Sequence, residues 1–292
     1  REEVPAELYE VVITKEGWLA ELPKLFKGKK LGFEPEAVSY ATYEAMGEKL
    51  GVKLVPVKGA VYGLRKRKDP AELELVRRAQ EITDWLFSWV LENLEPGKIT
   101  ERELALEMEY QMRKRGADGP AFSSIVASGP GSALPHYHPR DRVIDKGVLL
   151  LDFGAQYKGY ASDMTRTVYI GSPPQDFADA YNAVLEAQER AIQAVKVGAK
   201  CKEVDEAARG SLRRKGLDKL FVHGLGHGVG LDVHELPRVS YLSEEVLEGG
   251  EVITVEPGVY LEGRFGVRIE DMVFVAEEPQ VLTQSPKALI TL

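Results

Sequence analysis

The chain has 292 residues, of which 44% are hydrophobic and 29% charged, and its formal net charge at pH 7 is -8. Such a chain can bury a large core, and its composition is that of a soluble globular protein without an apolar run long enough to span a membrane. The acidic balance argues against a nucleic-acid partner, because phosphate binding needs a basic surface. The single cysteine, Cys201, cannot form an internal disulfide, which is typical of a reducing, cytoplasmic compartment.

Residues 1–63 are predicted to form a small, incomplete α/β unit. Two short apolar runs, LYEVVIT and VKLVPV, lie on either side of the segment LGFEPEAVSYATYEAMGEKLG. Short apolar runs next to a longer segment of mixed polarity indicate strands that pack against a helix. We therefore expect a minor N-terminal domain, followed by a larger domain over residues 64–292.

The larger domain is expected to begin with a basic run and a helix. The run RKRK, Arg65–Lys68, is interpreted as an exposed linker face. Asp69 can then serve as the N-cap, with Pro70 as the first helical residue. Glu72 is placed to complete a capping box, so a helix should run from there to about Asn93.

Three more helices are predicted further along the chain. Thr100 and Glu103 repeat the capping-box signature before a second helix, which should end near the glycine of RKRGADGP. Amphipathic patterns predict a third helix at about 175–196 and a fourth at about 202–215.

Strand-like segments alternate with these helices. VLLLDFG and YASDMTRTVYI flank AQYKG, and EVITVEPGVYL and VRIEDMVFVAEE flank EGRFG, so each group is predicted to be a β-hairpin. Helices followed by a hairpin occur twice, which hints at two related halves. An antiparallel sheet with helices on its outer side, an α+β fold, is the simplest arrangement.

Each predicted hairpin carries carboxylates within apolar strands. They are Asp152 in LLLDFG, Asp163 in ASDMT, Glu256 in TVEPG and Glu270 in VRIED. Buried ionised carboxylates are costly, and four close together would repel one another. The nearby arginines Arg166, Arg264 and Arg268 could supply positive charge. Two divalent cations would do so better, and an oxygen-rich ligand set suits Mn²⁺, Co²⁺ or Zn²⁺.

Histidine is confined to two short segments. ALPHYHP holds His136 and His138, and FVHGLGHGVGLDVHE holds His223, His227 and His234. Imidazole chemistry operates near neutral pH, so this clustering indicates a site. Each residue alone also has an ordinary interpretation: Asp152 as a turn residue, Glu270 as an ion-pair partner of Arg268, and His136 and His138 as surface residues. The glycines give no phosphate loop, because no Lys-Ser/Thr follows them.

Taken together, the segments LLLDFG, SDMTRT, HGLGHGVGLDVHE, TVEPGVY and GVRIED resemble the metal-dependent aminopeptidase family of pita-bread fold, peptidase family M24. EPGVY and VRIED favour its prolidase and aminopeptidase P branch over methionine aminopeptidases. The resemblance covers about residues 64–292 and implies a curved antiparallel sheet with outer helices. It also implies that residues 1–63 are part of a creatinase-like N-terminal domain, whose beginning we expect to be absent.

The resemblance further implies a centre of two metal ions. Its ligands would be Asp152, Asp163, His227, Glu256 and Glu270, with Asp163 and Glu270 bridging both ions. Asp152 would complete the shell of one ion, and His227 and Glu256 that of the other. Around them, His136, His223 and His234 would assist catalysis, and Arg268 would steady the bridging carboxylates. His138 matches no family position and is expected at the surface.

The activity that this resemblance implies is hydrolysis of Xaa-Pro bonds with Mn²⁺ or Co²⁺, or else Zn²⁺. His223 or His234 would donate a hydrogen bond to the developing oxyanion, and Glu256 or Glu270 would move the proton. We favour a dipeptidase (prolidase); an aminopeptidase P acting on longer peptides is the alternative, and a non-catalytic peptide-binding member is a more distant one. A Ser-His-Asp hydrolase is not supported, because no nucleophile elbow is present. The resemblance also favours a homodimer.

Overall fold

The computed structural model describes residues 8–25 and 28–292. Contacts between residues divide the chain into two units, Arg1–Leu64 and Arg65–Leu292. No helix in the described part of the chain has both the length and the hydrophobicity that crossing a bilayer requires.

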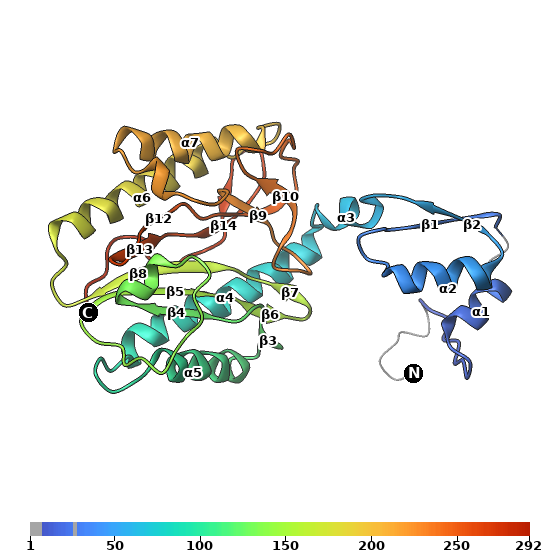
Figure 1. Ribbon diagram of the computed structural model, residues 1–292, viewed down its shortest axis with the longest axis horizontal. Coiled ribbons are helices and arrows are strands. Elements are labelled where there is room, and N and C mark those ends of the chain that lie inside the picture. The colour runs from blue at the N-terminus through green and yellow to red at the C-terminus, as the bar shows by residue number, and fades with distance from the viewer. Residues whose placement is uncertain (1–7, 26–27) are drawn as a thin grey trace. The chain divides into compact units, whose positions relative to one another are not determined.

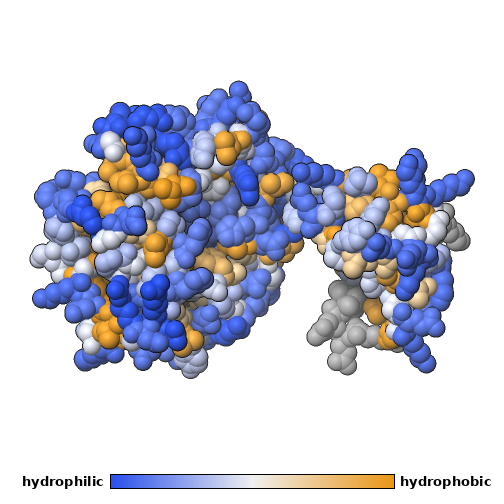
Figure 2. Space-filling view, in the orientation of Figure 1, coloured by the Kyte–Doolittle hydropathy of each residue, from blue (hydrophilic) through white to orange (hydrophobic). Residues whose placement is uncertain are grey.

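In the first unit, the described residues form a two-stranded parallel sheet and three helices, the last of which ends at the boundary with the second unit. Its elements are α1 (Trp18–Leu25), β1 (Lys30–Phe33), α2 (Tyr40–Leu50), β2 (Lys53–Pro56) and α3 (Ala60–Arg65). The α/β character predicted from the sequence is present, but the described residues of LYEVVIT form no strand. Large apolar side chains, among them Trp18 and Tyr40, remain exposed here, and Figure 2 shows apolar surface over this unit.

The second unit contains antiparallel sheets in two groups (Figure 1). The first group comprises β3 (Gly119–Pro120), β4 (Ile125–Ser128), β5 (Gly147–Phe153), β6 (Ala155–Tyr157), β7 (Tyr160–Ala161) and β8 (Met164–Ile170). The second comprises β9 (Gly226–Gly228), β10 (Glu235–Val239), β11 (Val252–Val255), β12 (Gly258–Leu261), β13 (Phe265–Arg268), β14 (Asp271–Phe274) and β15 (Gln280–Val281). Short 3₁₀ turns, η1 (Gly129–Ala133) and η2 (Asp218–Leu220), lie between strands and helices.

Both predicted hairpins are present. β5 pairs antiparallel with β8 along its whole length, and the AQYKG segment between them forms β6 and the turn of a smaller β6–β7 hairpin. In the second, β11 pairs with β14 and β12 with β13. Figure 1 shows α4 (Pro70–Asn93) and α5 (Glu101–Lys114) on one side of the strands, and α6 (Gln175–Ala194) and α7 (Cys201–Arg214) on the other.

All four predicted helices form close to their expected ends. Asp69 caps α4 and Thr100 caps α5, each in a complete capping box with the glutamate three residues on. One apolar core packs α4 and α5 against β5 and β8, and another packs α6 and α7 against β11, β12 and β13. The two halves therefore have separate cores, and the outer helices fix the strands that carry the acidic residues.

The interpretation of Arg65–Lys68 as an exposed linker is wrong for part of the run. Only Arg67 is well exposed, at 60% of its side chain, whereas the Lys68 side chain is 1% exposed. Acidic residues far along the chain pair with these bases, an arrangement that the local sequence does not reveal.

Candidate metal centre

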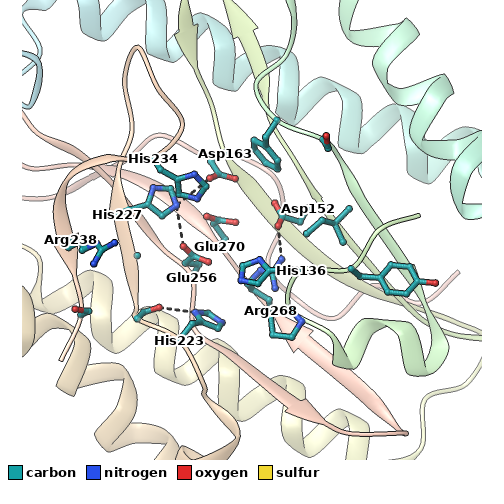
Figure 3. Close-up of a pocket in the computed structure, with 18 of the residues that line it drawn as sticks. His136, Asp152, Asp163, His223, His227, His234, Arg238, Glu256, Arg268 and Glu270 are labelled. Atoms are coloured by element: carbon teal, nitrogen blue, oxygen red, sulfur yellow. Dashed lines mark hydrogen bonds and ion pairs between the residues drawn. The ribbon is translucent and has the colours of Figure 1, made fainter. Parts of the chain in front are cut away.

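A cavity of about 600 Å³ lies in the second unit and is lined by residues from both groups of strands. All nine residues singled out as ligands or catalytic groups line it, as does His138. Figure 3 shows His227, His234, Asp163, Glu256 and Glu270 turned toward one hollow, with Asp152 beside Arg268. The structure thus brings together side chains that are up to 134 positions apart, from His136 to Glu270.

The strands deliver these side chains to one place through close backbone approaches. A Cβ atom on Gly154 would lie 1.8 Å from the carbonyl oxygen of Ser162, so only glycine lets the chain before Asp163 come this near to β5. Gly226 has the same role beside His227, since its Cβ would lie 2.1 Å from the Thr254 oxygen. Close backbone packing therefore explains why glycine occurs at these positions.

Asp163, His227 and Glu270 form the tightest group, with ligand atoms within 4.8 Å of one another. His227 Nε2 lies 3.6 Å from Asp163 Oδ2 and 3.3 Å from Glu256 Oε1. His227 Nδ1 donates to the Gly228 carbonyl at 3.0 Å. That bond fixes the ring so that Nε2 faces the carboxylates, as a ligating imidazole requires.

Asp152 stands beside this group and pairs with a buried arginine. Its Oδ2 accepts from Arg268 Nη2 at 2.6 Å, but its buried Oδ1 has no hydrogen-bond partner among the residues that the structure describes. A buried carboxylate oxygen without a donor is unfavourable, and a cation in the cavity would satisfy it. The donor set, oxygen atoms with one imidazole, thus fits divalent metal ions.

The pKa values of the acidic residues and of His227 also fit a site for divalent metal ions. Burial and neighbouring carboxylates raise the pKa of Asp163 and of Glu270 well above ordinary values. Burial alone would raise the pKa of Glu256, but the hydrogen bond from His227 lowers it to about 2. Burial opposes the charge on His227, yet Glu256 raises its pKa overall. Without cations the site therefore retains protons, which metal binding would displace.

Arg268, which the resemblance implies would steady the bridging carboxylates, reaches one of them indirectly. It pairs with Asp152, and it reaches Glu270 only through Thr165, whose hydroxyl accepts from Arg268 Nε at 3.0 Å and donates to Glu270 Oε2 at 2.6 Å. Arg268 Nη1 also donates to Tyr260 Oη at 2.7 Å. Thr165 and Tyr260 were missed by the sequence reasoning, although both lie in its recognised segments.

Both ring nitrogens of His223 are engaged by neighbouring protein groups. Its Nδ1 lies 2.8 Å from the Gly224 carbonyl and its Nε2 lies 2.9 Å from Tyr260 Oη. Burial lowers the pKa of His223 and raises the pKa of Tyr260 to about 12, which favours a hydrogen bond donated by the Tyr260 hydroxyl to Nε2 of a neutral His223 ring. This leaves His223 without a donor for substrate, in contrast to His234, which also lines the cavity and whose ring lies 4.3 Å from that of His227.

The loop after β4 carries His136 and His138, and one buried glutamate organises it. Glu101 is fully buried and accepts hydrogen bonds from the Ser128 amide and hydroxyl, the Tyr137 hydroxyl and the Arg140 amide. His136 and His138 flank Tyr137, are exposed, and line the cavity. His138 thus lies at the surface as expected, but at the rim of the site.

Two known families match the sequence. Residues 74–277 match metallopeptidase family M24, and residues 1–67 match the creatinase/prolidase N-terminal domain.

Individual relatives cover most of the chain. A protein named Xaa-Pro dipeptidase from Pyrococcus furiosus is 43% identical over 263 residues, which cover 89% of this chain and 75% of that protein. The solved structure of an Xaa-Pro dipeptidase from Bacillus anthracis has a TM-score of 0.94 at 42% identity, covering 97% of this chain and 81% of that one. An X-Pro aminopeptidase from Thermotoga maritima has a TM-score of 0.91 at 40% identity, covering 97% and 82%.

Proposed function

The chain belongs to metallopeptidase family M24 and is a peptidase of pita-bread fold, and on that basis we propose that it hydrolyses Xaa-Pro peptide bonds with two divalent metal ions. The observation that carries the proposal is the set of four carboxylates and one imidazole in one cavity, with Asp152 Oδ1 unsatisfied. Bound there, divalent ions would lower the pKa of water and polarise the substrate carbonyl.

The chain's own residues would hold those ions and orient the substrate. Asp152, Asp163, His227, Glu256 and Glu270 are the proposed ligands. Asp163 and Glu270 are the proposed bridging pair, and Mn²⁺ or Co²⁺ the proposed ions. The ligand set is supported by the positions of the side chains and by the oxygen-rich donor atoms, whereas the bridging roles follow from the family resemblance.

Substrate orientation would fall to the cavity wall. His234 has ring nitrogens available to donate to the substrate carbonyl oxygen, which makes it a better candidate than His223. An Xaa-Pro bond has no N–H, so recognition must come from the shape of the proline ring. Phe122, Ile125 and Pro135 line the cavity and offer apolar surface for that ring. Glu256, which lines the cavity, is the proposed proton acceptor, and Glu270 is the alternative.

We favour a dipeptidase over an aminopeptidase because of an arginine at the cavity. Arg238 lines it and is exposed, so its guanidinium is available to pair with the free C-terminal carboxylate of a dipeptide. A longer peptide would present an amide at that place. Relatives bearing both names exist, so the substrate comparison below decides between them.

The test is proline release by chelator-treated protein titrated with Mn²⁺ or Co²⁺. Xaa-Pro dipeptides and Xaa-Pro-Yaa tripeptides are compared at matched concentration, with Arg238→Met measured on both. We expect metal-dependent release, and a loss in Arg238→Met that is larger for dipeptides. Absence of metal-dependent release would contradict the proposed activity, whereas equal turnover of both substrates would contradict only the dipeptidase assignment.

Three further expectations belong to this proposal. A homodimer is the expected assembly, as the resemblance implies. Cytoplasmic localisation is proposed because the only cysteine is buried and unpaired. Residues 1–63 and 64–292 are proposed as separate domains, in line with the two matched families and with the division of contacts after Leu64.

A further inference from the structure

The basic run at the start of the second unit pairs with acids that lie next to the site. Arg65 Nη2 lies 2.7 Å from Asp232 Oδ2 and 2.8 Å from Glu235 Oε2. Lys68 Nζ lies 2.6 Å from Glu235 Oε1. Both oxygens of Glu235 are thus engaged by bases that precede it by about 170 positions.

The pair between Lys68 and Glu235 is deeply buried, with side chains only 1% and 2% exposed. This burial lowers the pKa of Lys68, although the neighbouring Glu235 raises it. The backbone at Gly230 also packs closely against the Lys68–Glu235 pair. A Cβ on Gly230 would lie 2.4 Å from Glu235 Oε1 and 2.8 Å from Lys68 Cε. A pair packed this tightly allows Glu235 very little freedom of position.

Glu235 in turn adjoins two histidines of the candidate centre. It follows His234 directly, and it is the first residue of β10, where it pairs with Gly228, the neighbour of His227. The rings of His227 and His234 lie 4.3 Å apart. The turn between them is held at its middle, since Gly230 donates to the Asp232 carbonyl and accepts from the Ala161 amide. A shift of Glu235 would therefore move His234.

We propose that Lys68, together with Arg65, is a positioning element that fixes His234 against the metal-binding side chains through Glu235. We call the contacts of Lys68 and Arg65 with Glu235 the clamp. The expected effect on catalysis rests on the proposed function, whereas the geometry of the clamp does not depend on the substrate. Lys68 itself does not line the cavity, so it acts only through Glu235. Groups that orient metal ligands usually change metal affinity or activity by about 10- to 100-fold when removed, and the lower end of that range is the scale we expect for Lys68.

The test uses Lys68→Met, which keeps the length of the side chain and removes its charge. Lys66→Met is the matched control: Lys66 belongs to the same run and pairs with the fully buried Glu251 at 2.9 Å, which does not line the cavity. Lys68→Met/Glu235→Gln removes both partners of the first pair. Such double replacements often keep a fold stable, so this variant carries the test if Lys68→Met does not fold.

Two measurements are made on full-length, folded protein. The first is kcat and KM for an Xaa-Pro dipeptide with metal content measured alongside. We expect kcat to fall about 10-fold or more in Lys68→Met and in the double variant. KM and metal content should stay within about twofold, and Lys66→Met should resemble the parent. A parent-like kcat in the double variant, or an equal loss in Lys66→Met, overturns the proposal.

The second measurement is the imidazole NMR spectrum of metal-free, histidine-labelled protein. The chain has only five histidines, and His234→Asn assigns the signal of interest. We expect the His234 resonance to shift or broaden in Lys68→Met and to stay in place in Lys66→Met. An unmoved resonance in Lys68→Met contradicts the clamp even if the parent protein proves inactive on Xaa-Pro peptides, so the two failures can be told apart.

Discussion

Arg268 and Asp152 form a buried ion pair in which Nη2 and Oδ2 are 2.6 Å apart, while the other carboxylate oxygen of Asp152 has no donor. The arginine thus neutralises one acid of the centre and leaves an oxygen for a cation. Arg166, by contrast, pairs with Asp271 and donates to backbone carbonyls, including that of Glu270. It stabilises the strand that follows Glu270 and does not line the cavity.

Replacing Arg268 should therefore destabilise the metal-free protein more than the metal-loaded protein. Arg268→Met leaves Asp152 as a buried, uncompensated charge, which costs about 3–5 kcal/mol. A cation at the centre would offset part of this cost. Denaturant unfolding with and without Mn²⁺ measures the difference. Arg264→Met is the control, because its pair with Asp176 is exposed and should be worth at most about 1 kcal/mol. An equal cost in both metal states would contradict the prediction.

Metal stabilisation should increase with pH. In the folded, metal-free protein the pKa values of Asp163 and Glu270 are raised, so these acids hold their protons to a higher pH than they do in the unfolded chain. Between the unfolded pKa of about 4 and the raised folded pKa, the folded state binds more protons, so stability falls as pH rises. Mn²⁺ removes this penalty. The rise in unfolding temperature on adding Mn²⁺ should be larger at about pH 8 than at about pH 5.5. A larger rise at the lower pH would show that these acids are not the ligands.

Glu101 should matter for activity although it does not line the cavity. Glu101→Gln places an amide where the Tyr137 hydroxyl and the Arg140 amide, or the Ser128 donors, need an acceptor. The expected cost is about 1–3 kcal/mol of stability, because buried donors lose their partner. Displacement of the loop that carries His136 should lower kcat/KM at unchanged metal content. Glu103→Gln, in the same helical turn but exposed, should leave kcat/KM unchanged. Equal kcat/KM in the two variants would contradict the prediction, because it would show that the loop held by Glu101 does not affect catalysis.

Cys201 should be inert in the folded protein. Burial raises the pKa of its thiol to about 12, so almost no thiolate forms at neutral pH. A colorimetric thiol reagent should detect no reactive group in native protein near pH 8 and one group after unfolding in denaturant. Rapid reaction of the native protein would indicate that α7 opens at its first turn.

The parts of the fold that the sequence predicts well depend on neighbours in the chain. Asp69 with Glu72, and Thr100 with Glu103, are capping boxes three residues long, and both form. The acidic hairpins were found for a similar reason, since alternation and turn residues are local signals. The family resemblance implied that these acids share one centre, and the cost of burying like charges implied that cations would accompany them; the structure places the acids around one cavity.

What the sequence did not predict depends on contacts across long separations. Lys68 looks like a solvated base until the chain brings Glu235 to it, and Tyr260 has no local feature that marks its bonds to Arg268 and His223. The expectation that His223 donates to substrate met the same limit, because its orientation is set by Tyr260. Such pairings require the tertiary structure.

The most direct test of the account counts metal ions per chain in parent protein and in Asp163→Asn, on the same samples used for Xaa-Pro dipeptide hydrolysis. Asp163→Asn keeps the side-chain shape and removes a proposed bridging charge. We predict two ions per chain and metal-dependent hydrolysis in the parent, and the loss of at least one ion with collapse of turnover in the variant. A variant that retains two ions per chain, or a parent that binds none, would contradict the proposed centre.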